Sequence, residues 1–248
     1  MRAESVVREA DKALQGRPAR RPAPALRVLQ IDPVLFTAPY DAALSSGLLA
    51  NGVMSAWATR HLRHGEEDLL AGQTTHRIFY PLTDGPRRRT GLPWRALKGV
   101  EHFVGLRQLG RMVERDGFDV VHLQWAPLPW LDRRMVERAR THAPVVMTVH
   151  DIQPFNGRPI SRFQRDGYDE VLAAATHLIV HTEAGQTALR TRGHAGARIS
   201  VVPHGPLPLV AGKAEPRAAD GRWRVVLFGR WFRLAHRPKR ALASGRVR

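Results

Sequence analysis

Two short apolar runs of this chain end abruptly in polar residues that could carry chemistry. The run VVMTV ends at His150 and Asp151, and the run ISVVP ends at His204 and Gly205. Apolar, β-branched runs of this length predict strands that are buried on both faces of a parallel sheet. Ligands of open α/β sheets bind just past the carboxyl ends of such strands. We therefore expect these four residues to lie at a ligand-binding edge.

The side chains at these run ends suit a ligand that is rich in hydroxyl groups. A neutral imidazole at His150 can form hydrogen bonds with a sugar hydroxyl or with a main-chain carbonyl. Gln124 and Trp125 end a third apolar run, FDVVHL, and the indole of Trp125 can stack on a sugar ring. A histidine in this position can also serve the fold alone, and the sequence leaves both interpretations open.

A further candidate is the turn that follows the first apolar run, RVLQI. This turn contains Tyr40 and Asp41, and Asp41 could cap the helix that follows. The free amides at such a helix start can bind an anion, although a simple capped turn explains the same residues. No Gly-x-Gly-x-x-Gly turn follows the run, and the chain has no Walker motif. The usual dinucleotide and P-loop sites are therefore not expected.

The spacing of the histidines does not predict a metal site. His177 and His181 are four residues apart, but they lie in a predicted strand, and no third ligand stands at a recognisable spacing. His61 and His64 lie in a polar loop. The chain has no cysteine, which excludes disulfides and thiolate ligands. We expect no metal in the site.

The residues that must position these groups alternate between strand-like and helical patterns. Strands are predicted near 27–31, 53–59, 77–80, 118–124, 145–149, 178–180 and 199–202, and helices near 41–50, 94–115, 127–140, 168–175 and 183–192. This alternation predicts an α/β fold with an open, doubly wound parallel sheet of the Rossmann-like kind.

Composition divides the chain into five segments. Residues 1–25 are expected to form a disordered leader, and residues 26–205 to form one α/β domain. Residues 206–222 contain several prolines and glycines and suggest a linker. Residues 223–230 predict the first strand of a second α/β domain, and residues 231–248 form a basic tail without acidic residues.

The formal net charge of +17 suggests a nucleic acid, an anionic lipid or a phosphorylated ligand as a partner. The charge distribution argues against specific nucleic-acid binding, because seven basic residues lie in 230–248 and a generally arginine-rich composition explains much of the remainder. Peripheral association with an anionic membrane stays open. The N-terminus has no apolar signal region and no run is long enough to span a bilayer, so we expect a cytoplasmic protein.

Taken in order, six segments of the chain resemble glycosyltransferase family 4, whose members are retaining enzymes of the GT-B fold. The segments are RVLQIDP, FDVVHLQW, PVVMTVHDIQPF, HLIVHTEAG, ISVVPHG and WRVVLFGR. Their order and spacing match the family from about residue 27 to about residue 230. The resemblance implies two Rossmann-like domains that face a cleft, with residues 26–205 as the N-terminal, acceptor-side domain.

The resemblance also implies a reaction. A hexosyl group would pass from a nucleotide-sugar donor to a glycan, lipid-linked or small-molecule acceptor. The nucleotide-sugar is a substrate, and the family needs no metal or other cofactor. Basic side chains and helix N-terminal amides neutralise the departing diphosphate instead.

The same resemblance assigns roles to individual residues. His150 matches the family histidine that touches the donor sugar and would be the catalytic residue. His204 and Gly205 match the interdomain edge of the donor site, Glu183 matches the wall of the cleft, and Arg230 matches the start of the basic site for the diphosphate. The expected substrate-binding set is Tyr40, Asp41, Gln124, Trp125, Asp151, Glu183, His204 and Gly205.

The chain departs from the family in two places. Pro39, Tyr40 and Asp41 stand in the first loop, where the family commonly has paired glycines. Beyond Gly229 little matches the family's second domain, so we expect this chain to be incomplete and inactive by itself. A non-catalytic acceptor-binding module that needs a separate donor domain is the alternative, and a basic nucleic-acid-binding protein is a third hypothesis. The sequence indicates neither the sugar, the nucleotide, the acceptor nor an oligomeric state.

Overall fold

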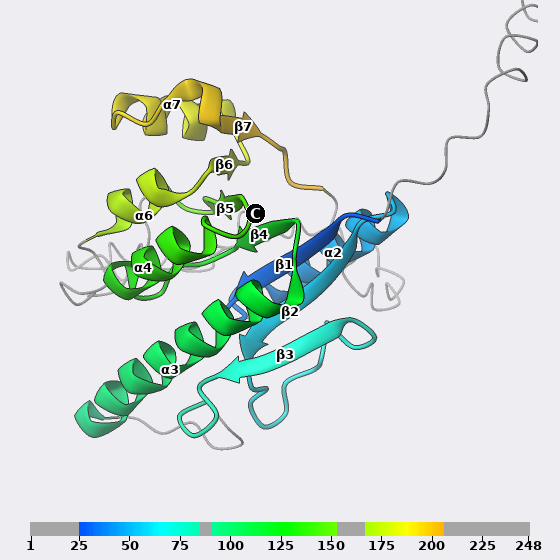
Figure 1. Ribbon diagram of the computed structural model, residues 1–248, viewed down its shortest axis with the longest axis vertical. Coiled ribbons are helices and arrows are strands. Elements are labelled where there is room, and N and C mark those ends of the chain that lie inside the picture. The colour runs from blue at the N-terminus through cyan, green and yellow to red at the C-terminus, as the bar shows by residue number, and fades with distance from the viewer. Residues whose placement is uncertain (1–24, 85–90, 153–166, 206–248) are drawn as a thin grey trace, which may run out of the picture.

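The computed structural model describes residues 25–84, 91–152 and 167–205, which form a seven-stranded parallel sheet with its helices (Figure 1). The strands are β1 (Arg27–Asp32), β2 (Met54–Arg60), β3 (Thr74–Phe79), β4 (Val120–Leu123), β5 (Val145–Thr148), β6 (His177–Val180) and β7 (Ile199–Val201). The helices are α2 (Ala38–Ala50), α3 (Leu92–Asp116), α4 (Pro129–Ala139), α6 (Tyr168–Ala174) and α7 (Glu183–Thr191), with a 3₁₀ turn η1 (Gly196–Arg198).

Among the described residues, no helix combines the length and the apolar character needed to cross a bilayer. The predicted leader, linker, second-domain strand and basic tail, with Arg230, lie outside these residues.

The order of the strands confirms the predicted doubly wound topology. Across the sheet the strands run β3-β2-β1-β4-β5-β6-β7, and every neighbouring pair is parallel. The chain winds outward from β1 to β3, returns through α3 to β4, and then winds outward in the other direction to β7 (Figure 1). The direction changes between β1 and β4, which makes that point the expected place for a ligand.

The central strands are apolar because both faces of the sheet are covered. Five successive residues of β1, from Val28 to Asp32, are buried, and successive side chains of a strand point to opposite faces. Helix α4 packs between α3 and α6, while α2 packs against β2 (Figure 1). The core includes Leu29 and Ile31 of β1 and Met147 of β5, all at most 1% exposed.

The loop between β1 and α2 is folded around the buried carboxylate of Asp32. Its Oδ1 accepts hydrogen bonds from the backbone amides of Val34 and Leu35 at 2.9 and 2.8 Å. Its Oδ2 accepts a hydrogen bond from the backbone amide of Phe36 at 3.0 Å. The loop leads directly into α2, so Asp32 helps to fix the position of Tyr40 in the first turn of that helix.

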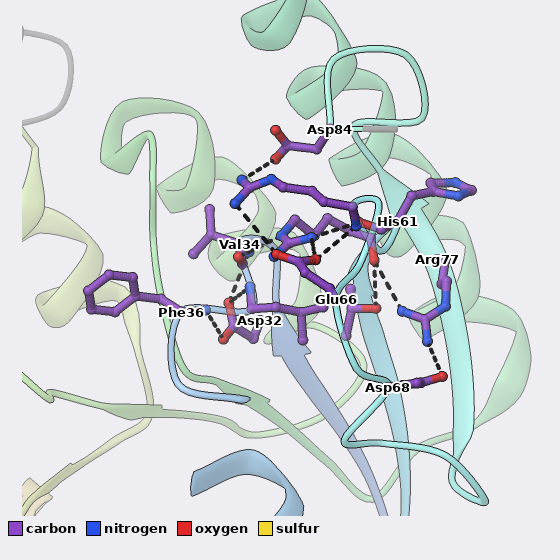
Figure 2. Close-up of polar contacts among 12 residues, drawn as sticks. Asp32, Val34, Phe36, His61, Glu66, Asp68, Arg77 and Asp84 are labelled. Atoms are coloured by element: carbon purple, nitrogen blue, oxygen red, sulfur yellow. Dashed lines mark hydrogen bonds and ion pairs between the residues drawn. The ribbon is translucent and has the colours of Figure 1, made fainter. Parts of the chain in front are cut away.

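Arg60, the last residue of β2, holds the same loop through contacts with Val34 and Glu66, both labelled in Figure 2. The Arg60 side chain is almost fully buried, and its Nε donates a hydrogen bond to the carbonyl oxygen of Val34 at 2.8 Å. Its two terminal nitrogens donate to the two carboxylate oxygens of Glu66 at 2.7 and 2.8 Å. Such bidentate pairs have a fixed geometry, so the guanidinium ties the β1–α2 loop to the segment that follows β2.

Helix α2 begins at Ala38, three residues before the start near residue 41 that the sequence predicted. Thr37 occupies the N-cap position, and Pro39 stands in the first turn, where a proline costs no hydrogen bond. The prediction that Asp41 caps this helix is therefore wrong. Asp41 lies one turn inside the helix, and its side chain is buried.

Helix α3 approaches strand β3 closely at Gly105. A Cβ atom added there would lie 2.4 Å from Cδ1 of Phe79 and 3.2 Å from the carbonyl oxygen of Ile78. We expect Gly105→Ala to lower the free energy of unfolding by about 1–3 kcal/mol, because the added methyl group must displace packed neighbours. Gly99→Ala in the same helix is the matched control. A Cβ atom at Gly99 meets nothing within 4 Å, so this change should stabilise the protein by about 0.5–1 kcal/mol.

Urea unfolding of the two glycine variants measures both effects. If Gly105→Ala proved as stable as Gly99→Ala, the close packing of α3 on β3 would be contradicted.

Candidate functional site

Five aromatic side chains gather beyond the carboxyl ends of the strands. They are Tyr40, Trp125, His150, His181 and His204, and we call them the strand-end cluster. Tyr40 follows β1, and the other four follow β4, β5, β6 and β7 in that order. The ring of Tyr40 meets all three histidine rings edge-on, with centroid distances of 5.0, 5.5 and 5.1 Å. Parallel strands therefore bring side chains from five distant segments to one place.

His150 lies at the centre of this cluster. Its ring stacks on that of Trp125, with centroids 5.1 Å apart and planes 14° apart. Its Nε2 lies 3.1 Å from Oε1 of Gln124, and its Nδ1 lies 3.4 Å from Nε2 of His181. Because an amide oxygen only accepts hydrogen bonds, Nε2 of His150 carries the ring proton. The sequence-based expectation that His150 stands at a strand end is confirmed.

Gln124 orients His150 from inside the fold. The Gln124 side chain is 1% exposed, and its Nε2 donates a hydrogen bond to Oε1 of Gln30 at 3.1 Å. This bond directs the amide oxygen of Gln124 toward His150. Gln124 therefore positions His150, and its predicted contact with a substrate stays a prediction. Trp125 is partly exposed, and its Nε1 donates a hydrogen bond to Oγ1 of Thr37 at 3.1 Å.

The surroundings keep His150 uncharged. Burial lowers the pKa of His150 to about 3, with smaller contributions from the neighbouring His181 and His204. Burial also lowers the pKa of His204, with a smaller contribution from His181. At neutral pH a neutral His150 ring is suited to a hydrogen bond with a hydroxyl group rather than to an ion pair with a phosphate.

The side chain of Asp41 is buried inside the fold. It is 0% exposed, and its Oδ1 accepts a hydrogen bond from Oγ1 of Thr37 at 3.3 Å. Burial, together with the neighbouring carboxyl group of Asp32, raises the pKa of Asp41 to about 10. Asp41 is therefore protonated at neutral pH. Asp41 thus supports the turn that carries Tyr40, and its contact with a substrate stays a prediction.

The remaining predicted residues are exposed at or after strand ends. Asp151 follows His150 directly, Glu183 is the first residue of α7, and Gly205 follows His204 directly. Their contacts with a substrate stay predictions. Arg230, predicted for the donor phosphate, lies outside the described residues.

His181 was not among the site residues predicted from the sequence. Its spacing suggested only a pair with His177, but Nε2 of His177 lies 2.8 Å from Oγ of Ser200, away from the cluster. The signal that identifies His181 is its place after the apolar run LIV, at the end of β6. The strand-end rule that selected His150 and His204 applies equally to this residue.

Comparison with known proteins agrees with this architecture. A model of Glycosyltransferase Family 4 matches residues 42–205 of the chain. No curated protein matches the chain.

Solved structures resemble the chain in fold. One is a UDP-N-acetylglucosamine 2-epimerase, with a TM-score of 0.50 and 15% identity, covering 71% of this chain and 48% of that one. The UDP-GlcNAc 2-epimerase from Neisseria meningitidis bound to UDP-GlcNAc has a TM-score of 0.50 and 14% identity, covering 71% of this chain and 45% of that one. Anabaena Alr3699/HepE in complex with UDP-glucose has a TM-score of 0.48 and 13% identity, and the match covers 73% of this chain and 44% of that one.

At these identities the likeness to solved structures shows the α/β, Rossmann-like fold and nothing more. The chain spans slightly less than half the length of these proteins. The family match covers more than half of the chain, and it agrees with the resemblance seen in the sequence. The chain therefore belongs to glycosyltransferase family 4.

Proposed function

We propose that this chain supplies the sugar-facing part of a glycosyltransferase, which moves a hexosyl group from a nucleotide-sugar to a glycan, lipid-linked or small-molecule acceptor. The observation that carries the proposal is the strand-end cluster. It stands beside the topological switch point, between the ends of β1 and β4 and along β5, β6 and β7. Ligands of doubly wound sheets bind at such a point. Membership of a glycosyltransferase family supports a sugar as the ligand.

Each part of the cluster has a proposed task. Nδ1 of His150 accepts a hydrogen bond from a sugar hydroxyl, since its Nε2 is already held by Gln124. Tyr40 and Trp125 supply ring faces and edges against which the C–H groups of a sugar pack. Asp151 and the other exposed residues at the strand ends meet the more polar parts of the substrates.

The donor's diphosphate needs positive charge when its bond to the sugar breaks. We propose that Arg230 contributes to that charge and that the transfer needs no metal or cofactor. The Neisseria meningitidis epimerase was solved with UDP-GlcNAc bound, so UDP-hexoses are the first donors to test.

A binding and turnover assay tests this function. The purified chain is titrated with UDP-, GDP- and dTDP-hexoses and with the free nucleotides, in the presence of EDTA, while tryptophan fluorescence is recorded. We expect saturable binding that is tighter for at least one nucleotide-hexose than for its nucleotide alone. Nucleotide release with added glycans then measures transfer.

We also predict that the 248-residue chain alone transfers sugar at a rate far below about ten per second. The same nucleotide-release assay checks this rate. If no hexose-bearing ligand binds and the chain is retained on DNA with a steep dependence on salt, the nucleic-acid hypothesis would replace this one.

A further inference from the structure

Three histidines of the strand-end cluster bring ring nitrogens together. His150, His181 and His204 each offer one nitrogen, and these nitrogens lie within 4.8 Å of one another. Nδ1 of His150 and Nε2 of His181 are 3.4 Å apart. Two ligand atoms of a tetrahedral zinc ion, with Zn–N bonds of about 2.0–2.1 Å, are separated by about 3.3 Å. The facing pair therefore already has the separation of two zinc ligands.

The surrounding hydrogen bonds select a tautomer for each of these two histidines. Nδ1 of His181 lies 2.8 Å from the carbonyl oxygen of Val202, which only accepts, so Nδ1 carries the proton of that ring. Nε2 of His150 carries the proton of its own ring, because it faces the amide oxygen of Gln124. A neutral imidazole has a single N–H group. When both rings are neutral in these tautomers, the two facing nitrogens carry the lone pairs that a metal ion binds.

Histidines that bind metals ordinarily donate their other ring N–H to a carbonyl or carboxylate oxygen, which fixes the ring and its tautomer. His181 has this arrangement with Val202, and His150 has it with Gln124. We infer that His150, His181 and His204 form a binding site for a divalent transition-metal ion of the zinc type.

The ligand set selects the class of ion. Imidazole nitrogens suit zinc, copper, nickel and cobalt ions, whereas magnesium and calcium ions prefer oxygen ligands. His204 is exposed, so an ion can reach the three rings from solvent. Three protein ligands leave a fourth position for water or for an atom of a bound molecule.

This inference goes beyond the proposed function, for which no metal is needed. The ion would bind Nδ1 of His150, which is the atom proposed to accept a bond from the sugar. Metal and sugar should therefore compete for His150.

The test measures metal binding in the absence of any sugar. The chain is stripped with a chelator, and Zn²⁺ is titrated in competition with a chromophoric chelator. Titration with Co²⁺ follows the visible absorption of a four-coordinate ion. We expect one tight site that Mg²⁺ does not fill, and we expect His181→Ala and His204→Ala each to weaken Zn²⁺ binding by about tenfold or more.

His177→Ala is the matched control, because His177 lies in the strand that precedes His181 but bonds to Ser200. Its affinity for Zn²⁺ should equal that of the parent, and circular dichroism confirms that each variant is folded. The inference is overturned if the double variant His181→Ala/His204→Ala binds Zn²⁺ as tightly as the parent, or if His177→Ala loses as much affinity as His181→Ala. Since no sugar is present, either result leaves the proposed function to its own assay.

Discussion

Replacing His150 with alanine is expected to weaken binding of the hexose-bearing ligand by about tenfold or more, the effect of one hydrogen bond in a buried site. Where transfer is measurable, its rate should fall by about a hundredfold or more, because a preorganised polar group at the reacting sugar is removed. The change removes the acceptor nitrogen and the ring that stacks on Trp125. Fluorescence titration and nucleotide release, as described above, measure the two effects.

His177→Ala serves as the control for this prediction too, since its ring lies away from the cluster and should leave ligand affinity unchanged. His150→Ala also leaves the amide oxygen of Gln124 without its partner, which should cost about 1–3 kcal/mol of stability. If ligand affinity were equal for His150→Ala and the parent, His150 would have to be assigned to the fold alone. A large loss of stability with no loss of affinity would support that assignment.

Asp41→Asn is expected to stabilise the protein increasingly as the pH rises. Burial and the adjacent Asp32 raise the pKa of Asp41 to about 10, whereas an aspartate in the unfolded chain titrates near 3.9. The stability contributed by protonated Asp41 is fully present below about pH 4 and is lost as the pH rises toward its folded pKa. Asparagine keeps the shape of the protonated carboxyl group and does not titrate.

The measurement is the difference in unfolding free energy between Asp41→Asn and the parent at pH 5 and pH 8. That difference should be larger at pH 8 by at least about 1.4 kcal/mol, the value of one pKa unit. Asp116→Asn is the control. Arg115 lowers the pKa of Asp116, so Asp116 is ionised from pH 5 to pH 8. The difference in unfolding free energy between Asp116→Asn and the parent should therefore be the same at both pH values. A flat difference for Asp41→Asn as well would show that Asp41 is charged in the fold.

The sequence predicted the fold well because its signals are local. The apolar runs at Val145 and Ile199 became β5 and β7, and the predicted helices appear within a few residues of their expected bounds. The predicted start of α2 was wrong. Both Thr37 and Asp41 can occupy the N-cap position, and the burial of Asp41 beside Asp32 leaves Thr37 as the N-cap. That contact depends on three-dimensional packing, which a local pattern does not contain.

The site was predicted only in part, for the same reason. The strand-end rule located His150 and His204, because position along a strand is visible in the sequence. The rule could not tell that Gln124 points inward to hold His150, since that depends on its bond to Gln30 in the neighbouring strand. His181 was overlooked because its partners are 31 and 23 residues away in the sequence, and spacing arguments for metal ligands compare near neighbours.

The most direct test of the central claim is a titration of ¹⁵N-histidine-labelled chain with UDP-hexoses, followed by NMR in the presence of EDTA. If the strand-end cluster is the sugar site, the ring signals of His150, His181 and His204 should shift saturably with the ligand. The ring of His102, which is fully buried between Tyr80 and Asp132, should not shift. Saturable binding of a UDP-hexose that leaves the three cluster histidines unchanged would contradict the account.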